Sequence, residues 1–398
     1  MTTKGLTRVQ ALLVGFLVVT SPAIFPADKT FTFVYLQHAE DPFYERHRAY
    51  TGLMLRDRHR PFGGAMTAIR ESRIIGRALG FKFKLVEKNL EPQEDAASVI
   101  DAFIANEGVR AFLLDLPLDV VTELGAALAD RNVLLFNIRH PDDRLRGEAC
   151  SPVLFHTLPS YAMLMDALAQ FLFRKKWTEV LVLEGEEKRD KVLSAAFQRA
   201  ARKFRLKVAD VRPFVLSNDP RMRGQINIPL LTGGKSYDVV FLADTLGEFG
   251  RYVPYNTQKA RPVVGSEGLT PDAWHWTWER HGAPQLNQRF DRTARRRMQD
   301  QDYAAWVAVK VVVEAIARTK TTDIAKLRTL MTSDDFTFDT YKGAPGNFRS
   351  WDNQLRQAIL LRTYNAVVAR APIEGFLHQR NDLDTLGTDK PESICNLQ

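Results

Sequence analysis

Polar and aromatic residues that could bind an anionic ligand recur at the carboxyl ends of predicted β-strands. These residues are Gln37, His38, Tyr44, Asn137, Arg139, Arg189, Phe249, Arg251, Trp274 and Trp276. An arginine donates two parallel hydrogen bonds to a carboxylate, and a tryptophan offers a flat face to a conjugated ring. Together they indicate a ligand that is an aromatic acid. The alternative for each arginine is a solvated surface position, and for the tryptophans an alternation between core and rim.

Sequence motifs for catalysis and metal binding are absent. The chain has no G-x-S-x-G, H-E-x-x-H or C-x-x-C sequence, and no G-x-G-x-x-G follows the first predicted strand. Gly234, Lys235 and Ser236 resemble the end of a phosphate-binding loop, but Pro229 stands where that loop needs its first glycine. The eight histidines are scattered without metal-ligand spacing. We therefore expect neither an enzyme nor a metal site.

Predicted strands and helices alternate along most of the chain. The first series has strands at residues 31–36, 81–85, 109–114 and 133–138, with helices at 65–79, 96–104 and 120–128. The second series has strands at 180–183, 206–211, 239–242 and 262–265, with helices at 161–173 and 191–204. Helices at 303–317 and 323–331 and apolar runs suited to strands at 355–370 follow.

This alternation predicts an α/β fold made of two lobes in series. Each lobe is a doubly wound parallel sheet with helices on both faces. Open α/β folds bind ligands at the carboxyl ends of their strands, so two facing lobes place a cleft between two such edges. The residues named above would line this cleft.

The N-terminus predicts export of the chain. Lys4 and Arg8 precede the apolar run at residues 11–19, and Ser21 and Ala23 supply the small residues of a cleavage site. This reads as a signal peptide at residues 1–23, because the run is shorter than the ~20 residues of a spanning helix. An uncleaved anchor is the alternative.

The two cysteines, Cys150 and Cys395, are each other's only possible partners within the chain. In an oxidising compartment we expect a disulfide in preference to two buried free thiols. Closing so long a loop would stabilise the fold by roughly 5 kcal/mol in the loop-entropy model, as an upper figure.

The charge pattern disfavours nucleic acid as a partner. The formal net charge is +8, and the densest basic run, at residues 292–297, is interleaved with threonine and alanine. Nucleic-acid binders concentrate lysine and arginine in one stripe. An anionic small molecule suits the modest basic bias better.

Several segments resemble one family of transport proteins. They are RPFGGA (60–65), RGEAC (146–150), HTLPS (156–160), EFGRYVPY (248–255), AWHW (273–276) and GFLHQ (375–379). With the signal peptide and two lobes, the chain resembles a type I periplasmic binding protein of the leucine/isoleucine/valine-binding class. Within that class it is similar to the ABC-transporter substrate-binding proteins associated with pyrroloquinoline-quinone (PQQ) dependent alcohol dehydrogenase systems.

The resemblance implies a periplasmic protein whose lobes are joined by three crossovers and close around a ligand by hinge motion. Lobe 1 would comprise residues 24–159 and 268–335, and lobe 2 residues 160–267 and 336–398. The amino-acid-binding members hold the ligand with a serine and threonine loop and an acidic residue. That pattern has no clear match here, which argues against an amino-acid ligand.

The ligand that the resemblance implies is PQQ, a flat ortho-quinone with three carboxylates. Arg139, Arg189 and Arg251 would then hold carboxylates, with Trp274 or Trp276 stacking on the ring. Gln37, His38 and Asn137 would hydrogen-bond the quinone edge. We expect a monomer that works with an inner-membrane ABC permease, and the resemblance suggests a PQQ-dependent alcohol dehydrogenase as a further partner. The alternatives are a receptor for another small acid or alcohol-derived metabolite, an accessory docking subunit of the dehydrogenase, and, least favoured, a hydrolase.

Overall fold

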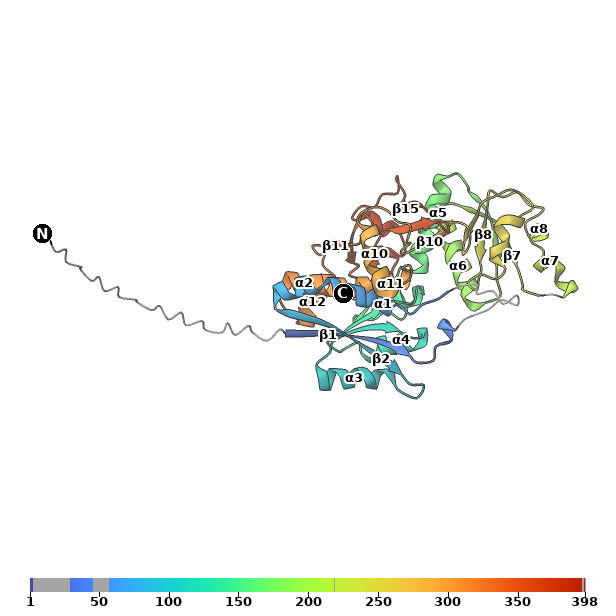
Figure 1. The fold of residues 1–398 in the computed structure, drawn as a ribbon. Coiled ribbons are helices and arrows are strands. Elements are labelled where there is room, and N and C mark those ends of the chain that lie inside the picture. The colour runs from blue at the N-terminus through green and yellow to red at the C-terminus, as the bar shows by residue number, and fades with distance from the viewer. Residues whose placement is uncertain (3–28, 46–56, 218, 396, 398) are drawn as a thin grey trace.

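The computed structural model describes residues 1–2, 29–45, 57–217, 219–395 and 397 (Figure 1). The predicted signal peptide lies almost wholly outside the described residues. Among the residues that are described, no helix combines the length and the apolarity needed to cross a bilayer.

Lobe 1 is built on a parallel sheet of five strands in the order β2-β1-β3-β4-β5. Its strands are β1 (Lys29–His38), β2 (Phe81–Leu90), β3 (Ala111–Asp115), β4 (Leu134–Asn137) and β5 (Leu154–His156). The central strand β1 is apolar on both faces: Phe33 and Tyr35 enter one hydrophobic core, and Val34 and Leu36 enter another. A parallel strand covered by helices on both sides needs this continuous apolar run.

Helices cover both faces of this sheet (Figure 1). α3 (Ala96–Glu107) and α4 (Leu118–Ala127) lie on one face. The other face carries α1 (Phe62–Glu71), α2 (Arg73–Leu79), α10 (Ala283–Ala294), α11 (Asp300–Thr319) and α12 (Ile324–Met331). α1 and α11 pack very closely, because a Cβ on Gly64 would lie 1.9 Å from the carbonyl oxygen of Asp302. Only glycine permits that approach.

Lobe 2 repeats the plan with four parallel strands in the order β7-β6-β8-β9. They are β6 (Glu179–Glu184), β7 (Lys207–Pro213), β8 (Val239–Ala243) and β9 (Val263–Gly265). The helices of this lobe are α5 (Tyr161–Arg174), α6 (Lys188–Lys203), α7 (Arg223–Ile226), α8 (Ile228–Leu231) and α9 (Val253–Asn256). The expected fold class, an α/β protein with two doubly wound lobes, is confirmed.

Two small antiparallel sheets complete the fold. One has the order β10-β14-β15, formed by β10 (Thr270–Asp272), β14 (Ile359–Arg362) and β15 (Val367–Ala371). The other has the order β11-β12-β13, formed by β11 (Phe338–Asp339), β12 (Pro345–Phe348) and β13 (Leu355–Arg356). Leu360 packs in the core of lobe 1, and its neighbours Ile359 and Leu361 pack in that of lobe 2. The chain therefore passes between the two cores along β14.

Two expectations about chain organisation need adjustment. The third crossover was expected near Phe336, but Phe336, Phe338 and Phe348 are buried in the lobe 1 core, where the hydroxyl of Tyr303 on α11 donates to the Thr340 carbonyl (2.8 Å). The helix expected at 65–79 is broken into α1 and α2 at Ser72. The Ser72 hydroxyl donates to the Ala68 carbonyl at 2.7 Å, a local bond that bends helices.

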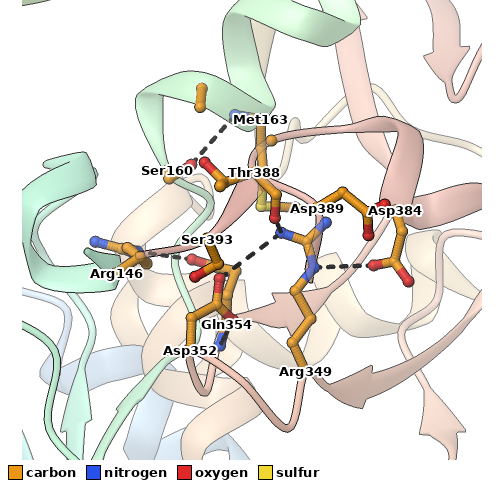
Figure 2. Close-up of polar contacts among 12 residues, drawn as sticks. Arg146, Ser160, Met163, Arg349, Asp352, Gln354, Asp384, Thr388, Asp389 and Ser393 are labelled. Atoms are coloured by element: carbon orange, nitrogen blue, oxygen red, sulfur yellow. Dashed lines mark hydrogen bonds and ion pairs between the residues drawn. The ribbon is translucent and has the colours of Figure 1, made fainter. Parts of the chain in front are cut away.

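A buried arginine ties the C-terminal segment to the hinge region (Figure 2). Arg349 donates from Nε to Asp384 (2.9 Å) and from its terminal nitrogens to the carbonyls of Leu386 (2.6 Å) and Thr388 (3.3 Å). Arg356 donates from Nε to both carboxylate oxygens of Asp384, at 2.8 and 2.9 Å. Asp384 therefore pairs with two buried guanidinium groups, and Asp352 lies 4.0 Å from Arg349 as a second carboxylate.

The same segment is anchored to lobe 2 and ends on lobe 1. The amide of Gly387 donates to Asp166 of α5 (2.8 Å), and Lys203 of α6 donates to the Gly387 carbonyl (2.8 Å). Eight positions later, Cys395 forms the predicted disulfide with Cys150, their Cα atoms 6.0 Å apart across 245 positions of sequence. The disulfide thus adds a covalent connection between the lobes beside the three crossovers.

Removing the disulfide should lower the free energy of unfolding. We expect the Cys150→Ser/Cys395→Ser double variant to lose up to about 5 kcal/mol, because the long loop is no longer closed in the unfolded chain. Urea unfolding followed by tryptophan fluorescence measures the loss. Dithiothreitol should destabilise the wild type and leave the double variant unchanged, and equal unfolding midpoints for the two proteins would contradict the assignment.

Replacing Asp384 should be among the most destabilising single changes. Asp384→Ala removes the carboxylate to which both Arg349 and Arg356 donate and leaves Arg349 only Asp352 at 4.0 Å; breaking such a buried pair typically costs about 3–5 kcal/mol. The exposed Asp335 supplies the control, since its replacement by alanine should stay within about 0.5 kcal/mol of the wild type. Both values come from urea unfolding, and a similar small loss at the two positions would refute the role given to Asp384.

Candidate functional site

The carboxyl edge of the lobe 1 sheet gathers polar side chains from three neighbouring strands. In the strand register, Gln37 of β1 lies beside Asn89 of β2 and Asp115 of β3. The Gln37 amide donates to Glu87 (2.7 Å) and Asn89 (2.6 Å), while its carbonyl oxygen accepts from Arg60 (3.0 Å). The side-chain amide and carbonyl groups of Gln37 are therefore occupied by neighbouring residues, which they hold in position.

Asp115 is the buried carboxylate at the centre of this edge. The hydroxyls of Tyr35 and Tyr44 each donate to one of its oxygens at 2.5 Å. Burial raises the pKa of Asp115, an effect that the charge of Arg139 and the two hydroxyls oppose. Burial and the nearby Asp115 also raise the pKa of Tyr44, so its hydroxyl stays protonated and serves as a donor.

Arg139 lies over this edge with its side chain 3% exposed. It donates to both oxygens of Asp41 (2.5 and 3.2 Å) and lies 3.6 Å from Asp115. Burial tends to raise the pKa of Asp41, but hydrogen bonds and charge from Arg139 prevail and hold it below its ordinary value. The Arg139 Nε has no hydrogen-bond partner among the described residues.

The aromatic ring of Phe43 is surrounded by three guanidinium groups from both lobes. Their Cζ atoms lie 4.3 Å (Arg139), 4.6 Å (Arg58) and 5.0 Å (Arg189) from the ring centroid. Arg58 also donates across to the carbonyl of Thr245 in lobe 2, at 3.2 Å. We call Arg58, Arg139 and Arg189 the arginine cage; it lies where the two lobes meet.

Local structure explains why these side chains converge. Asp41 caps the short 3-10 turn η1 (Pro42–Tyr44) by accepting from the Phe43 amide (2.9 Å). The Asn137 side-chain oxygen accepts from the amides of Arg139 (3.2 Å) and His140 (2.9 Å), which directs the chain after β4. Arg189 is the second residue of α6, directly after the β6 edge.

Four of the residues predicted from the sequence come together here: Gln37, Tyr44, Arg139 and Arg189. Asn137 contributes by shaping the turn, its side-chain nitrogen donating to the His140 carbonyl at 2.8 Å. His38 contributes its carbonyl oxygen, which accepts from Arg60 at 2.8 Å. Gln37 and Asn137, expected to meet the ligand, thus hold other residues of the site in place.

The other predicted residues lie elsewhere. Trp274 is buried in the lobe 1 core, stacked on Tyr303 with centroids 4.8 Å apart, so its ring is not open to a ligand. Phe249 is buried in lobe 2, stacked on Phe214 at 4.3 Å. Aromatic residues beside a sheet edge fill the core when an apolar partner is available. Trp276 lies under the Arg297 guanidinium (3.5 Å), and Arg251 lies over the Tyr252 ring (4.6 Å).

The sequence did not single out Asp41, Phe43, Arg58, Arg60 or Asp115. Asp115 ends β3, so the rule applied to the other strand ends would have found it. Asp41 and Phe43 lie beyond the strand in a turn whose placement depends on Arg139. Arg60 was noted only as part of a family-like segment.

This site is distinct from two large cavities that the described residues line. A cavity of about 680 Å³ lies between α11 and β11–β12, and one of about 720 Å³ lies beside the edge strand β7. At the arginine cage the protein's own Phe43 ring fills the space between the guanidinium groups. Chemically, the cage can neutralise carboxylates and stack on a planar ring.

A search of known families and structures places this fold. A profile of the family described as "Periplasmic binding protein" matches residues 64–220. A search of the curated proteins found no match.

Solved structures of binding proteins match over most of the chain. A branched-chain amino acid ABC transporter periplasmic ligand-binding protein from Burkholderia xenovorans has a TM-score of 0.67 at 14% identity, covering 85% of this chain and 95% of its own. A solute-binding protein from R. palustris in complex with benzoate has 0.62 at 11%, covering 92% and 99%. Another from Rhodopseudomonas palustris BisB5, in complex with 3,4-dihydroxybenzoic acid, has 0.61 at 13%, covering 86% and 94%. The chain therefore has the type I periplasmic binding protein fold.

The buried His140 beside the cage should make stability depend on pH. Burial, then repulsion by arginines including Arg139 and Arg189, lowers the pKa of His140 to about 4, against 6.5 for an ordinary histidine. The folded chain therefore binds fewer protons than the unfolded chain between these values. The resulting stabilisation is complete above pH 6.5 and is lost as the pH falls toward 4, about 3 kcal/mol in all.

His140→Gln removes the titration and keeps a donor for the carbonyl of Leu116, which contacts the His140 Nε2 at 2.6 Å. Unfolding free energies at pH 7 and pH 4.5 should differ less in the variant than in the wild type, by about 2–3 kcal/mol. Because other buried histidines titrate in both proteins, this difference isolates His140. Parallel pH dependence in the two proteins would show that His140 is not the group responsible.

Proposed function

We propose that this chain is a solute-binding protein of the ABC-transporter type that captures a small anionic aromatic solute between its lobes. It would bind without chemical turnover and present the solute to an inner-membrane permease. The site is then the arginine cage, with the Asp41 and Asp115 carboxylates setting the position of Arg139.

One observation carries this proposal: guanidinium groups from both lobes converge on a single aromatic ring. Arg189 in particular forms no hydrogen bond or ion pair with the described residues, although it faces the lobe interface over Phe43. A cation held at such an interface suits an anionic ligand, because closure around the ligand then gains charge-assisted hydrogen bonds from both lobes.

The comparisons support a solute of this class. Two of the structural neighbours are described as complexes with benzoate and with 3,4-dihydroxybenzoic acid. Those ligands are planar rings with a carboxylate, which is the chemistry that the cage suits. At 11–13% identity these proteins share the fold with this chain, so the ligand class rests on the cage itself.

PQQ is our first candidate among such solutes. It is flat and carries three carboxylates, which matches three guanidinium groups placed around a ring. Arg58, Arg139 and Arg189 would each approach a carboxylate. A receptor for a simpler aromatic acid is the second candidate, favoured by the two benzoate-type complexes.

This proposal gives the chain a place in the cell. It would act in the periplasm after removal of residues 1–23, with an ABC permease as its membrane partner. If PQQ is the solute, we propose a PQQ-dependent alcohol dehydrogenase as its recipient.

Replacing Arg189 should weaken ligand binding without disturbing the fold. We expect Arg189→Ala to raise the Kd for PQQ at least about tenfold, because one charge-assisted hydrogen bond contributes roughly 1.5–3 kcal/mol. Titration of the chain from Ile24 onward, followed by tryptophan fluorescence and quinone absorbance, measures the Kd.

Arg202→Ala is the matched control, since Arg202 is an exposed arginine at the far end of the same helix. Its Kd should equal that of the wild type. Arg251→Ala separates two views of lobe 2: an unchanged Kd leaves Arg251 outside the site, as its stacking on Tyr252 suggests. If Arg189→Ala binds PQQ as tightly as the wild type, the cage is not the binding site.

A further inference from the structure

The Phe43 side chain occupies an unusual environment for an apolar residue. Its ring lies among the guanidinium groups of the arginine cage and against Tyr44, whose ring is 4.9 Å away and nearly perpendicular. Phe43 is half-buried and belongs to none of the hydrophobic core clusters of the described residues. Packing in an apolar core therefore does not account for its position.

A phenylalanine ring satisfies the cage only in part. The negative faces of the ring attract guanidinium groups, but the ring carries no net charge to offset them. Arg139 is offset by Asp41 and Asp115. Arg189 has no such carboxylate among the described residues and is exposed, so its guanidinium group is accessible to an incoming anion.

A planar ring that bears carboxylates would supply both an aromatic face and negative charge. Its face would stack on the guanidinium planes as the Phe43 ring does, and its carboxylates would accept their hydrogen bonds. Such a ligand can take this position only if the Phe43 ring leaves, since two rings cannot share the space between the same three groups.

The local structure allows that movement. Phe43 lies on a short 3-10 turn whose cap, the bond from the Phe43 amide to Asp41, fixes the backbone but not the side chain. Asp41 is in turn held by Arg139. The turn can therefore remain on Arg139 while the Phe43 side chain rotates out.

Building on the proposed function, we infer that Phe43 is an internal occupant of the ligand site. Its ring holds the place of the ligand's ring in the unliganded protein and competes with the solute for the arginine cage. Because a solute must displace this ring to bind, the site favours solutes with both an aromatic ring and negative charge over neutral aromatic compounds.

The test is the sign of the change in affinity when Phe43 is removed. Phe43→Ala should bind benzoate and PQQ about tenfold more tightly than the wild type. In the wild type, only the molecules whose Phe43 ring has left the cage can bind the solute, and the apparent Kd rises as that fraction falls. Isothermal titration calorimetry gives the Kd for each probe. Phe173→Ala, which removes a part-exposed phenylalanine from α5 in lobe 2, should bind as the wild type does.

A second variant assigns the gain to the cage. In Phe43→Ala/Arg189→Ala, the tighter binding should disappear, since the vacated space has lost Arg189, the cage cation that an incoming carboxylate would pair with. Weaker or unchanged binding by Phe43→Ala, while the wild type binds, would overturn the inference and make Phe43 a ligand contact or a bystander. If neither folded protein binds either probe, the proposed function fails as well.

Discussion

The buried ion pair between Arg139 and Asp41 is the interaction on which the candidate site depends. A guanidinium group at the carboxyl edge of a parallel sheet is costly to bury unless carboxylates neutralise it. Asp41 provides two hydrogen bonds and Asp115 a nearby charge, and both tyrosine hydroxyls on Asp115 complete the arrangement. Because Asp41 also caps the η1 turn, the same pair places Phe43 and Tyr44 at the lobe interface. The Asp41 side chain therefore both neutralises Arg139 and fixes the backbone of the turn.

A second set of buried arginines stabilises the region between the lobes in the same manner. Arg349 and Arg356 share Asp384, and Arg349 also binds backbone carbonyls of the C-terminal segment (Figure 2). This segment reaches lobe 1 through the Cys150–Cys395 disulfide. The lobes are thus connected by three crossovers and one covalent bridge, which restrains how they move relative to each other.

Much of the fold was predictable because parallel strands carry a strong signal. The predicted strand at 31–36 corresponds to β1, whose two-sided burial requires a continuous apolar run. The three-residue strands β5 and β10 were not predicted, whereas β9, equally short, was, because it begins with two adjacent valines. In the site, Arg139 and Arg189 were predictable from their positions after strands. Phe43 was not, since the turn carrying it is held by a distant ion pair, and Trp274 was misplaced because sequence does not tell a stacking tryptophan from a core one.

The central claim is that an aromatic anion binds in the arginine cage. A crystal structure of the mature chain grown with saturating PQQ or benzoate tests it most directly. The account predicts a ring between Arg58, Arg139 and Arg189, carboxylates on these guanidinium groups, and the Phe43 side chain turned away from its present position. Ligand density elsewhere, or a cage still filled by Phe43 in a protein that binds the ligand in solution, would contradict it.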